Sequence, residues 1–230
     1  MKTLGLIGGM SWESTLVYYQ LLNRMTRERL GETHSAQLIL WSVDFAPIAV
    51  MQAEGRWDDA TAVLVDAAKR LERAGAEGLV ICANTMHRMA DEVQAAISIP
   101  LIHVADATAA AIRAAGVERP VLLATRYTME QAFYRDRLAA SGVQASIPGE
   151  ADRDRLQSII FDELIQGRFE PASGAAMLAM IDHAKGKGTD GVILGCTEFG
   201  LLIRPEDLDL PVFDTAVIHA EAAISFSLAN

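Results

Sequence analysis

The stretch Gly188-Thr-Asp-Gly-Val-Ile-Leu-Gly-Cys-Thr-Glu-Phe-Gly200 decides the fold, because a near copy of it lies in the other half of the chain. The copy reads Gly75-Ala-Glu-Gly-Leu-Val-Ile-Cys-Ala-Asn-Thr-Met-His87. Each copy has a glycine-bracketed turn, a short apolar run typical of a buried strand, and a polar segment where the strand ends. The pair therefore predicts a chain built from two similar halves.

The cysteines of the two copies are one residue out of step. When the copies are aligned on the glycine that opens each apolar run, Cys82 falls on Gly195 and Ala83 falls on Cys196. Successive residues of a strand point to opposite faces, so this slip predicts that Cys82 and Cys196 face different surroundings.

Short apolar runs alternate with helical patterns along the rest of the chain. Residues 44–57 read as a long loop with a proline and a glycine. Strands are predicted at 3–7, 37–42, 79–81, 100–103, 121–124, 143–147, 192–194 and 210–213. Helices are predicted from Ser11 or Ser14 to about 30, and at 58–74, 86–97, 105–115, 129–140, 152–165, 172–185 and 215–228.

This alternation predicts an α/β fold of two similar half-domains, each a parallel sheet flanked by helices, related by pseudo-twofold symmetry. The first half-domain is predicted to comprise residues 1–103 plus 215–230, and the second residues 104–214. Ligands of such sheets bind beyond the carboxyl ends of the strands, so we expect an active site between the half-domains.

Composition excludes several classes of function. The chain has 230 residues and a formal net charge of −10, without the basic cluster that nucleic-acid binding needs. Its apolar runs are too short to span a membrane, and its first residues do not read as a signal peptide, so we expect a soluble cytoplasmic protein. The five histidines lack ligand spacing, which argues against a metal site, and no nucleotide-binding glycine motif is present.

Cys196 is the strongest candidate for chemistry. It lies in a polar loop at the start of a turn, where backbone N–H groups lower a thiol's pKa, and a thiolate is a nucleophile or a general base. Thr197 and Glu198 are placed to orient it. A free cysteine is more commonly a small buried hydrophobic residue, and that interpretation stays open for Cys82. His87 is interpreted as a supporting group rather than a base.

Several motifs resemble those of the aspartate/glutamate racemase family over the whole chain, closest to its L-aspartate/glutamate-type and broad-specificity amino-acid racemases. They are Gly8-Gly-Met-Ser-Trp-Glu-Ser-Thr15, Ser42-Val-Asp-Phe45, Asn84-Thr-Met-His87, Thr125-Arg-Tyr-Thr-Met-Glu-Gln131 and Gly195-Cys-Thr-Glu198. The resemblance implies an amino-acid racemase that uses no cofactor, a small amino-acid substrate and a homodimer. In that mechanism one thiolate removes the α-proton and a thiol on the opposite face returns one.

The resemblance also implies roles for individual residues. Cys196 would act as the thiolate base on the L-substrate, while Ala83 stands where the family has its first catalytic cysteine. The opposite proton would then come from water, from Thr85 or from a displaced Cys82. The residues implied to bind substrate are Met10, Gln52, Ala83, Asn84, Thr85, Thr125, Thr128 and Thr197.

Two alternatives stay open on the sequence. One is a single-cysteine carbanion enzyme, such as a malonate-type decarboxylase, because one thiol protonates a planar intermediate from one face. The other is a non-catalytic protein that binds a small amino acid. Exchange of the α-proton with solvent deuterium distinguishes a racemase from both.

Overall fold

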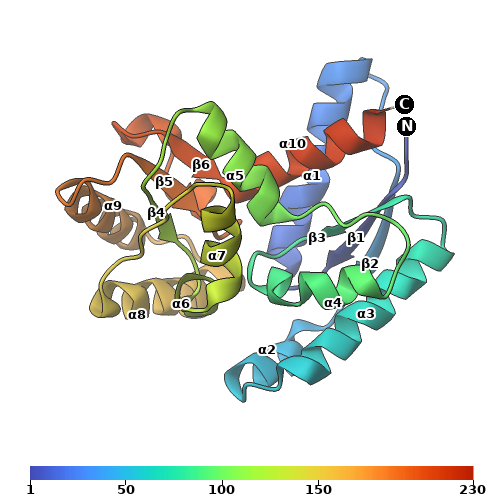
Figure 1. Ribbon diagram of the computed structural model, residues 1–230, viewed down its shortest axis with the longest axis horizontal. Helices are drawn as coiled ribbons and strands as arrows, with labels where there is room; N and C mark the ends of the chain where they lie inside the picture. Colours follow the sequence, from blue (N-terminus) through green and yellow to red (C-terminus); the bar gives the residue numbers. More distant parts are fainter. Residues whose placement is uncertain (230) are drawn as a thin grey trace. The chain divides into compact units, whose positions relative to one another are not determined.

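The computed structural model describes residues 1–229. The chain forms two compact units: Met1–His103 together with the C-terminal segment from His219, and Val104–Ile218 (Figure 1). Asn230, the last residue of the predicted first half-domain, lies outside the described residues. Within the part of the chain that the structure describes, no helix has both the length and the apolar character needed to cross a bilayer.

The first unit contains a three-stranded parallel sheet with the order β2-β1-β3. Its strands are β1 (Leu4–Gly8), β2 (Leu38–Ser42) and β3 (Gly78–Ile81). Strands β1 and β3 are buried along their whole length, whereas β2 is an edge strand with an exposed second half. Leu4 pairs with both Leu38 and Gly78, so the three carboxyl ends meet at one edge of the sheet.

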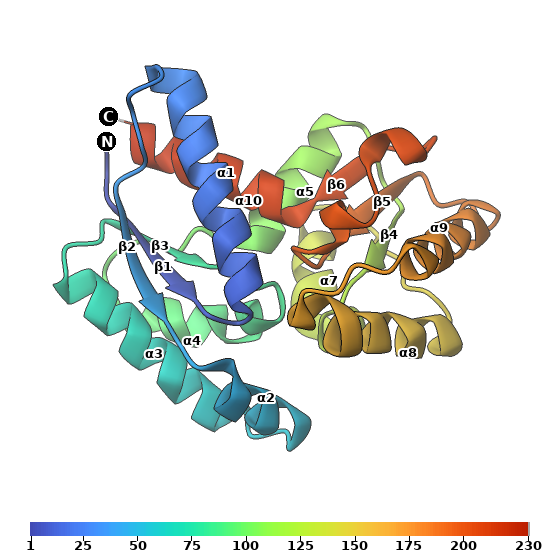
Figure 2. The ribbon, with the colours of Figure 1, turned by 180° about the vertical axis from the view of Figure 1, so that it is seen from behind.

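Helices cover both faces of this sheet (Figure 2). A Cβ added at Gly5 would lie 3.1 Å from Leu71 Cβ on α3, and one added at Gly8 would lie 2.5 Å from Thr15 Cγ2 on α1. Since odd and even strand residues point to opposite faces, α3 and α1 pack on opposite sides. The helices of this unit are α1 (Trp12–Leu30), α2 (Phe45–Ala53), α3 (Trp57–Arg73), a 3₁₀ turn (Thr85–Met89), α4 (Ala90–Ala95) and the end of α10 (Thr215–Leu228).

The second unit repeats this plan with a parallel sheet of order β4-β5-β6. Its strands are β4 (Pro120–Leu123), β5 (Gly191–Leu194) and β6 (Val212–Asp214). Its main helices are α5 (Val104–Ala114), α6 (Arg126–Glu130), α7 (Ala132–Ala140), α8 (Glu150–Ser158), α9 (Pro171–Lys185) and the start of α10. A π-helical turn (Ile159–Glu163) and a 3₁₀ turn (Leu164–Gln166) follow α8. The predicted fold class, parallel sheets flanked by helices in both halves, is confirmed.

The repeated strands both begin at a glycine because neighbouring side chains press on that position. A Cβ at Gly78 would lie 2.4 Å from Phe226 Cε1, and a Cβ at Gly191 would lie 2.9 Å from Val117 Cγ1. A Cβ at either position would force its neighbours to shift, so the packing favours glycine at the start of both strands.

The prediction of a loop over residues 44–57 is wrong, because Phe45–Ala53 forms helix α2. Asp44 caps this helix, and its side chain accepts a hydrogen bond from the Ala46 N–H (3.2 Å). Pro47 lies in the first turn, where a missing N–H costs no intrahelical hydrogen bond. The proline that suggested a loop is therefore compatible with a helix start.

Two predicted strands shrink to single bridges. The segment 100–103 pairs with β3 only through Leu101 and Leu79, and the segment 143–147 pairs with β4 only through Ser146 and Val121. The helix predicted over 86–97 begins as a 3₁₀ turn and continues as the short α4.

Candidate active site

A backbone loop at the carboxyl end of β1 is held rigidly by two glycines. Gly9 has a φ of +88°, and a Cβ there would lie 2.2 Å from the Val43 carbonyl oxygen. The Gly9 N–H donates to Thr15 Oγ1 (2.8 Å). Ser11 is the N-cap of α1, and Met10 before it is buried. The loop thus places Met10 and Ser11 at the edge where ligands of parallel sheets bind.

The residues after β3 and β5 occupy matching positions. The Cys82 N–H donates to the Ile7 carbonyl (2.9 Å), and the Gly195 N–H donates to the Leu123 carbonyl (2.7 Å). Each bond continues the ladder from the first strand of its sheet. A Cβ at Gly195 would lie 2.9 Å from Ala124 Cβ, whereas the same position in the first unit holds the Cys82 side chain.

The one-residue slip of the cysteines therefore exists in the structure as well as in the alignment. Cys82 is completely buried, while Ala83 and Cys196, which follow at equivalent positions, are 8% and 9% exposed. Burial raises the pKa of the Cys82 thiol far above its ordinary value.

Asn84 and Thr85 follow Ala83 and open the 3₁₀ turn Thr85–Met89, with both side chains largely buried. Two residues on, His87 Nδ1–H donates to the Ala83 carbonyl oxygen (2.8 Å). His87 is thus hydrogen-bonded to the backbone of Ala83, the position at which the aspartate/glutamate racemase family has its first cysteine.

A buried group of histidines lies next to this turn in the first unit, and no local sequence pattern indicates it. His219 Nε2–H donates to the Ile102 carbonyl (2.7 Å), and its Nδ1 accepts from the Tyr18 hydroxyl (2.8 Å). The His87 ring centroid lies 4.7 Å from that of His103 and 5.4 Å from that of His219. Burial lowers the pKa of His219 to about 4, so this imidazole is neutral at pH 7.

Gln52, predicted to bind substrate, lies on α2 and is 5% exposed. Its side-chain Nε2 donates to Met86 Sδ at 3.0 Å. A thioether is a weak acceptor, so this buried amide holds a hydrogen bond that a carboxylate or amide would improve. The contact also ties α2 to the turn that carries Asn84 and Thr85.

In the second unit, the segment after β5 forms a thiol–carboxylate pair. The Cys196 thiol donates to Glu198 Oε2 (3.1 Å), and the Thr197 hydroxyl donates to the same oxygen (2.5 Å). Glu198 is only 2% exposed, so these bonds satisfy a buried carboxylate. Glu198 is thus in direct contact with Cys196, and Thr197 holds the same carboxylate.

The electrostatics of Cys196 differ from the sequence-based expectation. Burial, followed by the charge of Glu198 and the hydrogen bond to it, raises the thiol pKa well above its ordinary value, and Asp214 adds to the effect. Asp214 Oδ1 accepts from the N–H groups of Ala216 and Val217 (2.9 and 3.2 Å), and burial raises its pKa. The expected lowering of the pKa by backbone N–H groups is therefore wrong for this structure: burial, together with two nearby carboxylates, outweighs it, and Cys196 is a thiol at rest.

Thr125 and Thr128 lie at the carboxyl end of β4, the strand that pairs with β5. Thr125 is the N-cap of α6, its Oγ1 accepts from the Thr128 N–H (3.2 Å), and the two hydroxyl oxygens are 3.1 Å apart. The second unit thus brings Thr125, Thr128, Cys196 and Thr197 to neighbouring strand ends. Among residues 1–229, no cluster of histidine, cysteine or acidic side chains is arranged to hold a metal ion.

A duplicated parallel α/β plan, with a thiol hydrogen-bonded to a carboxylate at one strand end, defines a class of proteins suited to acid–base chemistry on a small ligand. A sequence model of the Asp/Glu/Hydantoin racemase family matches residues 7–223. The chain belongs to this family, and the family places it among the isomerases.

Known proteins agree with this assignment. A candidate Asp/Glu racemase from Yersinia pestis is 47% identical with a TM-score of 0.92, and each chain is covered fully. An aspartate racemase homologue from Pyrococcus horikoshii is 36% identical with a TM-score of 0.88, also over both full chains. The broad-specificity amino-acid racemase RacX of Bacillus subtilis is 23% identical over 175 residues, 75% of this chain and 74% of RacX.

Proposed function

We propose that this chain is a cofactor-independent racemase of an aspartate- or glutamate-type amino acid, with Cys196 as the base on the L-enantiomer. The observation that carries the proposal is the buried Cys196–Glu198 hydrogen bond (3.1 Å) at the carboxyl end of β5, in a chain of a racemase family. It pairs a thiol with a group able to accept the thiol's proton.

The first step moves the Cys196 Sγ proton to Glu198 Oε2, because the carboxylate already accepts that hydrogen bond. The resulting thiolate takes the α-proton of the L-amino acid, and the C–H electron pair stays on the α-carbon as a carbanion. The ammonium group of the substrate offsets negative charge that otherwise keeps Cys196 protonated. Glu198 is therefore part of the base, not only its support.

The carbanion must then receive a proton on its other face. Position 83 carries a methyl group, which has no proton to donate, and the Cys82 side chain is completely buried. We assign this proton to water or to the Thr85 hydroxyl. Water and alcohols are much weaker acids than a thiol, so racemisation is slow or one-sided compared with a two-cysteine site.

Hydroxyl and amide groups at the strand ends are assigned to the substrate. Thr125, Thr128 and Thr197, with Asn84 and Thr85, supply hydrogen bonds that stabilise charge developing at the α-carboxylate. Met10 and Ala83 supply apolar contact. Gln52, whose amide now donates to Met86 Sδ, is assigned to the substrate's side-chain carboxylate or amide.

We also propose a homodimer that covers an exposed apolar stripe on α1. Trp12, Leu16 and Tyr19 lie on successive turns of that helix and are 65%, 47% and 54% exposed. A stripe of this kind is typical of an association surface. Sedimentation of the wild type and of a Trp12→Ala, Tyr19→Ala variant tests this assignment.

The test of function is α-proton exchange in deuterium oxide, followed by NMR, with the L- and D-forms of aspartate and glutamate. Wild type is expected to exchange the L-form, Cys196→Ala to lose that exchange, and Cys82→Ala, the matched control, to keep it. Equal exchange of both enantiomers that depends on Cys82 would contradict the assignment of the second proton. If Cys196→Ala and Cys82→Ala both keep the exchange, Cys196 is not the base.

One observation favours a second candidate, a single-thiol decarboxylase of malonate-type acids. The methyl group of Ala83 leaves Cys196 as the one thiol at a slightly exposed strand end among the described residues. A thiol that protonates a carbanion from one face needs no partner. Carbon dioxide release from a substituted malonate, without α-proton exchange of amino acids, would select this function over racemisation.

A further inference from the structure

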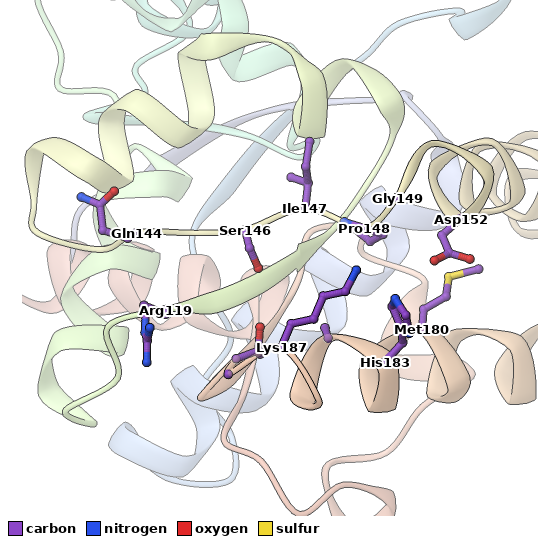
Figure 3. A pocket seen from close by; sticks show the side chains of 13 residues that line it. Arg119, Gln144, Ser146, Ile147, Pro148, Gly149, Asp152, Met180, His183 and Lys187 are labelled. Carbon is purple, nitrogen blue, oxygen red and sulfur yellow. The ribbon is translucent and has the colours of Figure 1, made fainter.

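A cavity lies in the second unit, at the edge of the sheet opposite to Cys196. It has a volume of about 180 Å³. Its walls come from Arg119 before β4, the segment 144–149 that leads into α8, the end of α9, and the turn before β5 (Figure 3). Since β5 runs from Gly191 towards Cys196, this cavity borders the amino ends of the strands. It is therefore separate from the proposed catalytic residues.

The walls of this cavity are well fixed. The segment 144–149 runs beside β4. The Ser146 N–H donates to the Pro120 carbonyl (2.9 Å), and the Leu122 N–H donates to the Ser146 carbonyl (2.8 Å). Met180 is 7% exposed and forms an apolar part of the wall. The cavity is thus formed by hydrogen-bonded backbone and a packed helix, not by a loose loop.

The lining holds two permanent cations and one carboxylate. Arg119, Lys187 and His183 line the cavity, and Asp152 is the one acidic residue that does. In Figure 3, Arg119 and Asp152 lie on opposite sides of Lys187, whose side chain points towards Pro148. A Cβ at Gly188 would lie 3.9 Å from Arg119 Nη2, so the guanidinium reaches the turn that follows Lys187.

Arg119 and Lys187 lack the carboxylate partners that several other arginines of this unit have. Arg126 pairs with Asp154, Arg137 with Asp106, and Arg153 with Glu130. Within residues 1–229 no ion pair forms to Arg119 or Lys187. The nearby Asp190 carboxylate is instead occupied by the backbone N–H groups of Glu118 and Arg119 (2.9 and 2.8 Å). In a chain of net charge −10, an unneutralised cationic cavity is suited to an anion.

Neutral donors complete the lining. The Ser146 hydroxyl makes only a long bond to the Pro120 carbonyl (3.4 Å), and the Thr189 hydroxyl and Gln144 amide also border the cavity. Gly149, another lining residue, is the N-cap of α8 and provides no side-chain cap for its N–H groups. The start of a helix favours an anion, although Glu150 and Asp152 already place negative charge in the first turn of α8.

The volume limits what the cavity can hold. About 180 Å³ equals roughly six water molecules at their ~30 Å³ share of the liquid, and falls below the ~300–1,000 Å³ of sites that enclose drug-sized ligands. A coenzyme or nucleotide cannot be enclosed there. We propose that this pocket binds a small oxyanion, a phosphate group alone or at the end of a small metabolite, with Arg119 and Lys187 as the cations of its lining.

The test is calorimetric titration of the full chain with inorganic phosphate, at constant ionic strength maintained with sodium chloride. Wild type is expected to bind one phosphate saturably. Arg119→Gln and Lys187→Gln are each expected to weaken binding about tenfold, because each removes a charged hydrogen-bond donor. Lys185→Gln is the matched control, since Lys185, the last residue of α9, lies two residues before Lys187 but pairs with Asp209 (3.4 Å) and does not line the cavity.

Retention of wild-type affinity in Lys185→Gln, with the loss in both pocket variants, would support the site. Absence of saturable binding up to tens of millimolar phosphate would overturn it. Equal weakening in all three variants would also overturn it, because that result indicates general attraction to positive charge. Glycerol 3-phosphate in the same titration separates a phosphate ester from the free ion. These outcomes do not depend on racemase activity, so the site stands or falls independently of the proposed function.

Discussion

The substitution Ala83→Cys tests the one-residue slip most directly, because it restores a thiol at the position equivalent to Cys196. Ala83 and Cys196 have nearly equal exposure (8% and 9%), so the added sulfur reaches the same kind of surface. Under the proposed mechanism, exchange of the D-enantiomer should rise in this variant, while exchange of the L-enantiomer stays near the wild-type rate.

The size of the increase follows from what surrounds the new thiol. A positioned general acid or base contributes about 10²–10⁴-fold. In the second unit, Glu198 stands two residues after Cys196 and accepts a hydrogen bond from its thiol, but the equivalent position in the first unit is Thr85. Without a carboxylate partner we expect the low end, about 10²-fold, which equals about 2.7 kcal/mol of barrier.

The assay is deuterium incorporation into D-aspartate and D-glutamate, with time courses by NMR. Ala83→Ser, which is similar in size but has no thiol, is the control and should leave D-exchange unchanged. The same substitution made in a Cys82→Ala background excludes the native cysteine as the source. A folded Ala83→Cys variant with unaltered D-exchange and intact L-exchange would refute the strand-register reasoning.

Three further predictions follow from single contacts. Glu198→Gln should lower exchange of the L-enantiomer about 10²-fold. It should also speed alkylation of Cys196 by iodoacetamide at pH 7, because removing the carboxylate charge lowers the thiol pKa. Slower alkylation would contradict this cause. Gly195→Ala should destabilise the fold by about 1–3 kcal/mol in urea unfolding, since its Cβ would lie 2.9 Å from another Cβ. Gly186→Ala should be near neutral, since its φ is −61° and the nearest atom to its Cβ would be 3.5 Å away. The folded-state pKa of His219, about 4, lies below the ordinary 6.5. The contribution of neutral His219 to the free energy of unfolding is therefore complete above pH 6.5, and up to about 3 kcal/mol of it is lost as the pH falls to 4. Replacing it with glutamine should flatten that part of the stability curve, and an unchanged slope would count against the assignment.

The sequence predicted the duplicated strands well because glycine and apolar runs act locally. Gly78 and Gly191 open strands of equal length, four residues each, as the alignment of the two copies required. Helix α2 was missed because Pro47 and Gly55 were taken as loop signals, although a proline in the first helical turn breaks no hydrogen bond.

The site could be predicted only as far as neighbours in sequence determine it. Glu198 lies two residues from Cys196, so its role as orienting group was visible in the sequence. Asp214 reaches the same thiol from the end of another strand, and its effect on the pKa of Cys196 required the fold. The contacts of His219 with Tyr18 and Ile102 join residues more than a hundred positions apart, and no local pattern indicates them.

The packing around Gly195 means that a cysteine can be moved by one position in the first unit but not in the second. In the first unit, exchanging the pair Cys82-Ala83 for Gly-Cys only removes a buried side chain and adds an outer one. The reverse exchange in the second unit would force a sulfur-bearing side chain into contact with Ala124 and the Leu123 carbonyl, about 3 Å from where its Cβ begins. A thiol can therefore be added at position 83, equivalent to Cys196, but a cysteine at position 195 cannot be introduced to replace a lost Cys196.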